Sequence, residues 1–453
     1  MERGLHLGNK EELANFTARD TIHINENNHL EIAGVDTVEL AKKYGTPLVI
    51  YDIQTVRENI RELKEGLFDY QGPTEVSYAS KAFSSVAFYQ TIHQENIAID
   101  VVSGGELYLA KQAGFPAKKI NFHGNNKSLQ ELTDALDYNI GNIIVDNFYE
   151  LEMLKQLTKQ RQQMTNILLR ITPGVSADTH QYIMTGQADS KFGFDLQNGQ
   201  AEQALKEALE ASYLNVEGLH MHIGSQIFDT DSYALSMNQI LSHVNKWQKK
   251  YGFQLKVFNI GGGFGVQHTS EEAKNSPKKQ LKRISQQLMK LLDDYGMVYP
   301  ELWIEPGRSI VSEAGTTIYE IGSQKTLPKI RNYVSIDGGM SDNIRPAFYD
   351  AKYTGFVANR MNAEANTVVS IAGKACESGD MLIYDLPLPE VKAGDLLAVI
   401  NTGDYTFAMA NNYNRIPRPA VVFVEDGKDF LAVRRETPKD FMRFENTLPK
   451  YNH

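Results

Sequence analysis

The stretch "EVSYASKAFSS", residues 75–85, joins a run of β-branched and aromatic residues to a lysine and then to small residues. The run predicts a buried strand, and Lys81 stands where that strand ends. A lysine at a strand edge is most often an ordinary surface residue. The importance of Lys81 therefore depends on what the rest of the chain places beside it.

Similar strands recur along the chain and decide the fold class. Eight β-rich runs between residues 48 and 305 alternate with amphipathic patterns that predict helices. Eight βα units over about 250 residues predict a (β/α)8 TIM-like barrel, because the competing doubly wound sheet rarely needs so many consecutive units. The runs are "TEVSYA" (74–79), "IAIDVV" (97–102), "KINFHG" (119–124), "NIIVD" (142–146), "ILLRI" (167–171), "NVEGLHMHI" (215–223), "KVFNI" (256–260) and "LWIE" (302–305).

The character of the sequence changes after residue 310. Runs such as "TTIYEIGSQKT" (316–326) and "PAVVFVED" (419–426) are strand-like, and no helical pattern separates them. They predict a mostly antiparallel C-terminal β domain. A strand-like piece, "HLEIAG" (29–34), also precedes the barrel pattern. We therefore expect residues 1–40 to join the β domain, 41–310 to form the barrel and 311–453 to form the β domain.

The composition narrows the class of protein. The 453 residues are 42% hydrophobic and 23% charged, which are ordinary globular values. The net charge of −10 argues against a nucleic-acid partner, because phosphate binding requires a basic face. The single cysteine, Cys376, rules out an internal disulfide and fits a reducing compartment. Without an apolar leader or a membrane-spanning stretch, we expect a cytoplasmic protein with no membrane partner.

Reactive residue types gather at the carboxyl ends of the predicted strands, where barrel active sites lie. The glycines that follow strand seven would let backbone N–H groups approach a phosphate. A lysine, a phosphate cradle and an acid at the end of strand eight together indicate pyridoxal 5'-phosphate (PLP) held on the lysine. The residues and motifs concerned are Lys81, Asp100, Arg170, "HMHIGSQ" (220–226), "GGGFG" (261–265) and "EPGR" (305–308).

The pair His220 and His222 leaves a second interpretation open. Two histidines spaced H-x-H on a strand can ligate zinc, as in a metal-dependent hydrolase. That interpretation does not account for the glycine-rich turn or for Cys376, which lies among polar residues in "KACESGD" (374–380). For His220, a histidine packed on a core wall is a third interpretation.

Taken together, the motifs resemble those of the barrel-type PLP-dependent decarboxylases, whose fold is alanine-racemase-like. The resemblance extends from "YASKAF" (78–83) to "NNYNRIPRP" (411–419), which is most of the chain. It rests on these motifs together with "HGNNKS" (123–128), "HIGSQ" (222–226), "GGGFG", "EPGR", "DGGMSDNIRPAFY" (337–349), "CESGD" (376–380) and "GDYTFAMANNYN" (403–414).

The resemblance implies a role for each matched residue. Lys81 matches the lysine that carries the cofactor, His222 a histidine stacked on its ring, and Glu305 the acid that faces its pyridine nitrogen. Cys376 matches a proton donor contributed by the neighbouring subunit of a homodimer with shared active sites. No metal is implied. The implied cofactor-binding residues are Lys81, Asp100, Arg170, His222, Ser225, Gly262, Gly263, Glu305, Gly307, Arg308 and Tyr405; the implied substrate-binding residues are Arg308, Arg345, Tyr349, Glu377 and Tyr405.

These residue types suit the decarboxylation of an amino acid with a charged far end. A carboxylate at Glu305 would keep the ring nitrogen protonated, and the thiol of Cys376 can donate a proton. Glu377 can bind a distal ammonium, while Arg345 and Arg308 can bind a distal carboxylate. We therefore expect decarboxylation of meso-2,6-diaminopimelate to L-lysine and CO₂, the last step of lysine biosynthesis.

Three alternatives stay open at this point: a related decarboxylase for ornithine, arginine or a carboxylated polyamine, a non-catalytic homologue, and the zinc hydrolase. Arg345 argues against ornithine and arginine, whose far ends are cationic, and less against a carboxylated polyamine. Two positions depart from the family pattern, since Phe83 replaces an asparagine and Asp404 replaces an alanine. Asp404 adds a negative charge beside Tyr405 unless its side chain points away.

Overall fold

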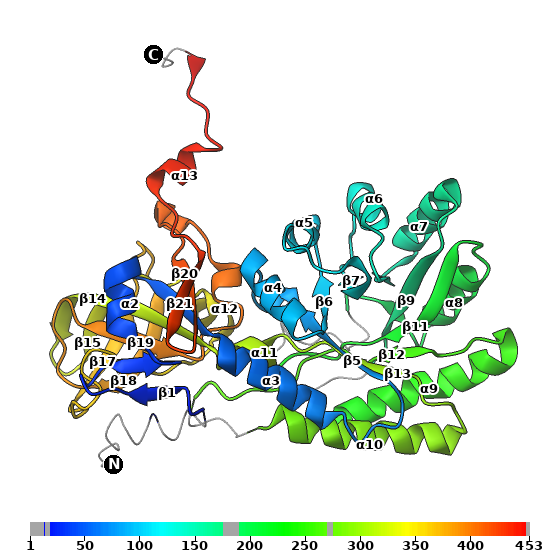
Figure 1. Ribbon diagram of the computed structural model, residues 1–453, viewed down its shortest axis with the longest axis horizontal. Helices are drawn as coiled ribbons and strands as arrows, with labels where there is room; N and C mark the ends of the chain where they lie inside the picture. The colour runs from blue at the N-terminus through cyan, green and yellow to red at the C-terminus, as the bar shows by residue number, and fades with distance from the viewer. Residues whose placement is uncertain (1–12, 14–18, 175–189, 270–274, 450–453) are drawn as a thin grey trace. The chain divides into compact units, whose positions relative to one another are not determined.

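The computed structural model describes residues 13, 19–174, 190–269 and 275–449, and the chain forms two compact units (Figure 1). One unit comprises residues 1–58, 267–273 and 311–453 and is called the β unit below. The other comprises residues 59–266 and 274–310 and is called the barrel unit.

The barrel unit contains eight parallel strands in the order β9-β11-β12-β13-β5-β6-β7-β8, and β8 pairs with β9 to close the barrel. Each of the eight predicted runs overlaps one of these strands, which confirms the predicted barrel. A short parallel strand, β10 (Phe194–Asp195), adds to β9. The barrel strands are β5 (Thr74–Ala79), β6 (Ala98–Val101), β7 (Ile120–Phe122), β8 (Asn142–Val145), β9 (Thr165–Thr172), β11 (Leu214–His220), β12 (Val257–Asn259) and β13 (Glu301–Ile304).

Helices on the outside of the barrel connect its strands (Figure 1). Several begin at a serine or asparagine whose side chain accepts a hydrogen bond from a backbone N–H of the first turn, namely Ser85, Ser103, Ser128, Asn147 and Ser276. Such caps satisfy N–H groups that a first turn otherwise leaves unpaired. The helices that connect barrel strands are α4 (Val86–Gln94), α5 (Gly104–Gln112), α6 (Leu129–Tyr138), α7 (Phe148–Arg161), α8 (Gln200–Leu209), α9 (Asp231–Tyr251) and α10 (Pro277–Tyr295). The helix α3 (Ile53–Gly66) precedes β5, α11 (Arg308–Val311) follows β13, and the 3₁₀ turns are η1 (Ser80–Ala82) and η2 (Ala117–Lys119).

The β unit is built on a sheet in the order β18-β17-β15-β14-β4-β20-β21, in which β19 pairs with both β14 and β16. Its pairings are antiparallel except for β15–β17 and β4–β20, so the predicted mostly antiparallel domain is confirmed. The strands are β4 (Leu48–Asp52), β14 (Gly315–Leu327), β15 (Arg331–Ile336), β16 (Gly355–Val357), β17 (Thr367–Ala372), β18 (Met381–Leu388), β19 (Leu396–Ile400), β20 (Ala420–Glu425) and β21 (Lys428–Val433).

A second, three-stranded sheet completes the β unit. It consists of β1 (Ile22–Ile24), β2 (Leu30–Ile32) and β3 (Val35–Asp36). Leu30 and Ile32 of β2 share a hydrophobic core with Ile50 of β4 and Val422 of β20. The remaining elements are α2 (Thr37–Tyr44), α12 (Arg345–Tyr349), α13 (Pro438–Met442), η4 (Phe407–Met409) and η5 (Tyr413–Arg415). Within the described ranges, every helix is too short or too polar to cross a lipid bilayer.

Candidate active site

The predicted site residues of the barrel unit lie at or near the carboxyl ends of its strands. Lys81 lies in η1, directly after β5, and is exposed. Asp100 and Arg170 are buried near the ends of β6 and β9. The others follow β11, β12 or β13 directly: His222, Ser225, Gly262, Gly263, Glu305, Gly307 and Arg308. The barrel therefore brings together side chains that are up to 227 positions apart, from Lys81 to Arg308.

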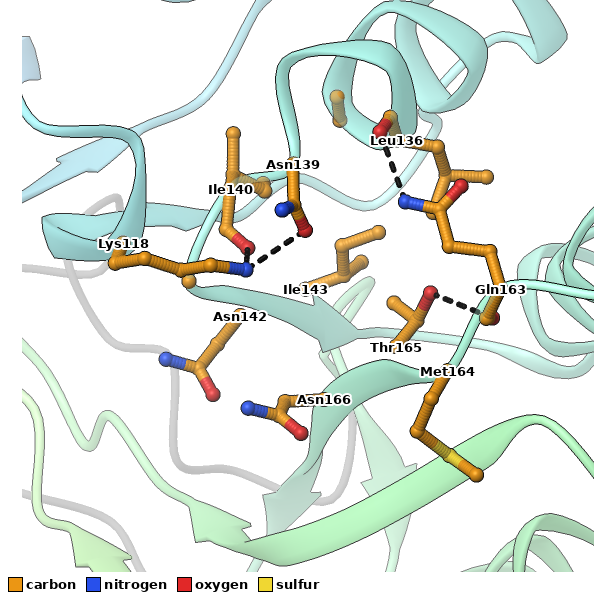
Figure 2. Close-up of a pocket in the computed structure, with 12 residues that line it drawn as sticks. Lys118, Leu136, Asn139, Ile140, Asn142, Ile143, Gln163, Met164, Thr165 and Asn166 are labelled. Carbon is orange, nitrogen blue, oxygen red and sulfur yellow. Dashed lines mark hydrogen bonds between the residues drawn. The ribbon is translucent and has the colours of Figure 1, made fainter.

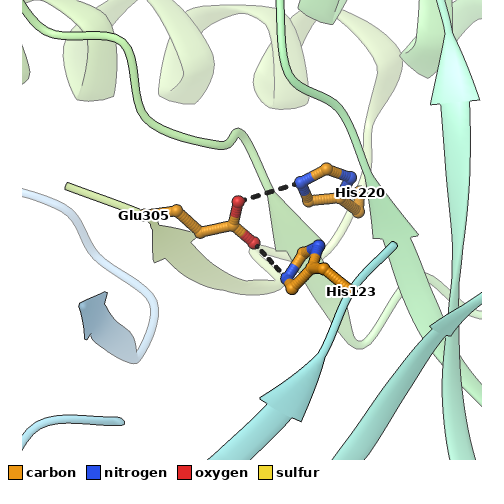
Figure 3. Close-up of side chains that lie close together, drawn as sticks. All are labelled: His123, His220 and Glu305. Carbon is orange, nitrogen blue, oxygen red and sulfur yellow. Dashed lines mark hydrogen bonds and ion pairs between the residues drawn. The ribbon is translucent and has the colours of Figure 1, made fainter. Parts of the chain in front are cut away.

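Glu305 is the centre of a buried polar cluster (Figure 3). Its Oε2 lies 3.0 Å from His220 Nε2, and its Oε1 lies 3.0 Å from His123 Nε2. Asn259 Nδ2 donates a hydrogen bond to the same Oε1 at 2.6 Å. Burial opposes ionisation, but the two histidines hold the pKa of Glu305 well below its usual range. Glu305 is therefore a carboxylate although its side chain is only 9% exposed.

His123 lies between two acids. Its Nε2 is 3.6 Å from Asp100 Oδ1 in addition to its contact with Glu305. Burial alone would lower the pKa of His123, but the charges of Glu305 and Asp100 outweigh burial and raise it to about 9. Burial lowers the pKa of His220 to about 4, despite the opposing effect of Glu305. His123 is thus a cation and His220 a neutral ring that donates its Nε2 proton to the carboxylate.

The glycine-rich turn after β12 leaves no space for side chains. A Cβ on Gly262 would lie 2.0 Å from the backbone oxygen of Glu305, and one on Gly263 would lie 2.2 Å from that of Gly224. Gly263 also has a φ of +96°, which only glycine adopts without strain. Beside this turn, Arg308 Nη2 donates to Ser225 Oγ at 3.2 Å. A bare backbone with an arginine and a hydroxyl nearby suits an anion such as phosphate.

His222 presents a neutral ring next to the same turn. Its Nδ1 accepts a hydrogen bond from Gly262 N at 3.3 Å. Burial, followed by the positive charges of Lys81 and Arg170, lowers the pKa of His222 well below its usual value. The two histidines of "HMH" therefore face different partners, since His220 contacts Glu305 and His222 contacts the glycine turn.

The donor set of this barrel end fits PLP. A lysine can hold the aldehyde, the glycine turn with Arg308 can hold the phosphate, and the Glu305 carboxylate can face a protonated ring nitrogen. Two buried atoms, Asp100 Oδ2 and His220 Nδ1, have no hydrogen-bond partner among the described residues. A polar ligand or a water molecule can satisfy such atoms.

Apart from Arg308, which belongs to the barrel unit, the predicted substrate residues lie in the β unit. Arg345, at the start of α12, is buried and donates from Nη1 to the backbone oxygen of Asp404 at 3.1 Å. The same Nη1 forms an ion pair with the Asp404 carboxylate. Asp404 Oδ1 lies 3.4 Å from His268 Nε2. The charge that departs from the family pattern is therefore directed at an arginine. Burial lowers the pKa of Arg345, but Tyr353 and Asp404 together outweigh burial and raise it.

The other β-unit residues occupy more open positions. The Arg345 guanidinium lies 5.8 Å from the centre of the Tyr405 ring, and Tyr349 ends the same helix, α12. Cys376 and Glu377 are exposed in the turn between β17 and β18. The backbone N–H of Cys376 donates to Asn414 Oδ1 at 2.7 Å, which ties the "CESGD" and "NNYN" motifs together.

The departure at position 83 has a packing explanation. Phe83 is fully buried, and its ring lies edge-on to Phe88 with 5.1 Å between ring centres. Its backbone N–H donates to the hydroxyl of Tyr78, which in turn donates to the Phe83 carbonyl. Phe83 therefore anchors the turn that carries Lys81.

Sequence reasoning assigned no role to His123 or Asn259. Both are polar residues at the end of a barrel strand, since His123 follows β7 directly and Asn259 is the last residue of β12. The rule that identified Lys81 and Glu305 would have identified them too. The sequence alone does not show that both side chains contact the Glu305 carboxylate.

A separate pocket of about 130 Å³ lies at the opposite end of the barrel (Figure 2). Its polar lining includes Asn142, Thr165 and Asn166, which begin β8 and β9, and Lys118, which precedes β7. Lys118 Nζ donates to Asn139 Oδ1 at 2.7 Å. Amino-terminal strand ends in such barrels serve stability rather than catalysis, so this pocket is distinct from the candidate site.

Comparison with known proteins agrees with the fold. Residues 53–312 match the family model described as pyridoxal-dependent decarboxylase, pyridoxal binding domain. The fold and site therefore define a PLP-dependent decarboxylase of the barrel type.

Relatives across almost the whole chain narrow the family. Diaminopimelate decarboxylase of Bacillus methanolicus is 55% identical over 92% of this chain and 96% of its own, and that of Bacillus subtilis is 53% identical over 93% and 96%. The crystal structure of diaminopimelate decarboxylase from M. jannaschii in co-complex with L-lysine has a TM-score of 0.88, 34% sequence identity, and coverage of 95% of this chain and 99% of that one. The chain belongs to the diaminopimelate decarboxylase family.

Proposed function

We propose that this protein decarboxylates meso-2,6-diaminopimelate to L-lysine and CO₂, with PLP held on Lys81. The observation that carries the proposal is the buried, ionised Glu305 at the same barrel end as an exposed lysine and a glycine turn. When bound, PLP accepts the electrons that loss of CO₂ leaves behind. The membership of the diaminopimelate decarboxylase family supports the same reaction and substrate.

The barrel residues have separate tasks in this proposal. Lys81 would hold the cofactor, and His222 would offer its neutral ring to the cofactor. Glu305 keeps a proton on the ring nitrogen, because a carboxylate favours a cation beside it. Ser225, Arg308 and the backbone of the glycine turn bind the phosphate.

The β-unit residues recognise the two ends of the substrate and return a proton. Arg345 lies beside the ring of Tyr405, and its guanidinium can bind a substrate carboxylate. Glu377 is exposed and can receive the distal ammonium. Cys376 is an exposed thiol and donates the proton that replaces CO₂.

We also propose a cytoplasmic homodimer in which Cys376 and Glu377 serve the active site of the neighbouring subunit. The support is the exposure of both side chains in one turn and the resemblance of "CESGD" to the family motif. A single free thiol fits a reducing compartment. Mixing a Lys81→Ala variant with a Cys376→Ala variant tests this arrangement, since heterodimers would regain one complete site. Failure to regain activity would contradict shared sites.

The first experiment is a visible absorption spectrum of the purified protein with PLP, followed by assays for CO₂ and lysine on meso-diaminopimelate. We expect the absorption band of lysine-bound PLP together with lysine formation. The band without lysine would keep the cofactor and redirect the substrate search to carboxylated polyamines. Absence of the band would overturn the assignment of Lys81.

Two variants separate the cofactor from the proton donor. Lys81→Ala should abolish both the absorption band and lysine formation. Cys376→Ala should keep the band but slow turnover about a hundredfold or more, the usual effect of losing a general acid. Unchanged turnover in Cys376→Ala would remove that thiol from the mechanism.

A further inference from the structure

The cluster around Glu305 contains a second buried carboxylate, that of Asp100, as well as the charged ring of His123. Asp100 and Glu305 are buried carboxylates with 6% and 9% of their side chains exposed, and both lie within 3.6 Å of His123 Nε2. Two buried carboxylates so close together cannot both stay ionised without a cation between them. The imidazole ring of His123 occupies that position.

The charges of the cluster sum to a single negative charge. Burial and the charge of Glu305 raise the pKa of Asp100 to about 6, so at neutral pH Asp100 still contributes one negative charge. Glu305 contributes a second negative charge and His123 one positive charge, while His220 is neutral. The charged neighbours of the cluster come in pairs of opposite sign: Arg170 with Asp146, at 3.8 Å, and Lys81 with Glu106. The cluster therefore lacks one positive charge for neutrality.

We propose that His123 and Asp100 act as a charge-balancing pair that leaves one negative charge on Glu305 for the ring nitrogen of PLP. His123 allows Glu305 to stay ionised when buried, and Asp100 cancels the charge of His123. Without Asp100, the imidazolium would neutralise the carboxylate on which the pyridinium depends. The proposal rests on the assignment of Glu305 to the ring nitrogen made above, and it makes His123 and Asp100 positioning residues.

The two members of the pair should therefore have opposite effects when each is removed. Asp100→Asn leaves the cluster neutral and makes a protonated ring nitrogen unfavourable. His123→Gln leaves two negative charges and favours that proton at least as strongly. The Asp100→Asn substitution changes little else, because Asp100 Oδ1 accepts from Ser77 Oγ at 2.5 Å and from Asn121 Nδ2 at 3.3 Å, and an asparagine oxygen can keep both bonds.

The test compares the affinity of the apoenzyme for PLP with its affinity for 1-deazapyridoxal 5'-phosphate, which has a carbon in place of the ring nitrogen. The wild type should prefer PLP by roughly tenfold or more, the effect of an unlike charge near a titrating group. Asp100→Asn should lose that preference, His123→Gln should keep or increase it, and the double variant should return to the wild-type value. Histidine ¹⁵N signals of the apoenzyme should also show a doubly protonated His123 at neutral pH.

A ratio of two affinities cancels losses that come from poor folding, which lower the binding of both compounds alike. Equal affinities in the wild type would overturn the inference even if a variant could not be purified. A decrease of the preference in both single variants would also overturn it. Wild-type lysine formation alongside equal affinities would leave the proposed function standing, so the two failures are distinguishable.

Discussion

Removal of the Asp404 carboxylate tests how much the buried ion pair between Asp404 and Arg345 stabilises the β unit. Asp404 has a fully buried side chain, and that of Arg345 is 8% exposed. Asp404→Ala leaves the Arg345 guanidinium buried without its partner, which costs about 3–5 kcal/mol. For a unit of about 200 residues, that loss corresponds to a decrease in Tm of roughly 6–20 °C.

Differential scanning calorimetry of four proteins measures the effect: the wild type, Asp404→Ala, the double variant Asp404→Ala/Arg345→Met, and Arg415→Ala. The double variant should regain much of the lost Tm, because no uncompensated charge is left. Arg415→Ala is the matched control, since it removes the exposed ion pair of Arg415 with Glu445 and should change Tm little. A Tm for Asp404→Ala equal to that of the wild type, or a double variant as unstable as Asp404→Ala, would refute the reasoning.

Three further outcomes follow from the geometry. Gly262→Ala should lower the affinity for PLP and the free energy of unfolding, the latter by about 1–3 kcal/mol, because the new Cβ would lie 2.0 Å from a backbone oxygen. Gly105→Ala is the control: its Cβ would lie 3.6 Å from the nearest atom, so this variant should bind PLP normally in the same titration. Lys127→Met should lower the free energy of unfolding, measured in urea, by about 3–5 kcal/mol, because it leaves the Glu150 carboxylate buried without its partner; each side chain of the pair is 1% exposed. The double variant Lys127→Met/Glu150→Gln should recover much of this stability. The pKa of His123 in the folded protein is about 9, above the ordinary value of about 6.5. Protonated His123 therefore stabilises the folded state fully below pH 6.5, and this stabilisation is lost as the pH rises to 9. The Tm of the apoenzyme should fall across that interval, and His123→Gln should flatten the fall; equal slopes would contradict the charge assigned to His123.

Much of the barrel could be read from the sequence because parallel strands buried on both faces are nearly continuous apolar runs. "NIIVD" and "ILLRI" are examples, and both coincide with strands that are buried over most of their length. Strand β4 was not among the predicted strands. Its residues, "LVIYD", show the same apolar pattern as a barrel strand, yet they pair with β14 and β20 in the other unit. Local pattern does not distinguish the two partners, because strand pairing depends on residues more than 250 positions away.

The sequence by itself determined the types of chemistry available to this protein: a lysine at a strand end, a glycine-rich turn, an acid after the last barrel strand and one thiol. Those features follow from local residue patterns and their spacing. The tertiary structure decided their charge states. Only closure of the barrel places His123, Asn259 and Glu305 from three strands in one buried cluster, and only the fold of the β unit turns Asp404 toward Arg345. Protonation depends on burial and on neighbouring charges, and neither exists until strands distant in sequence are brought together.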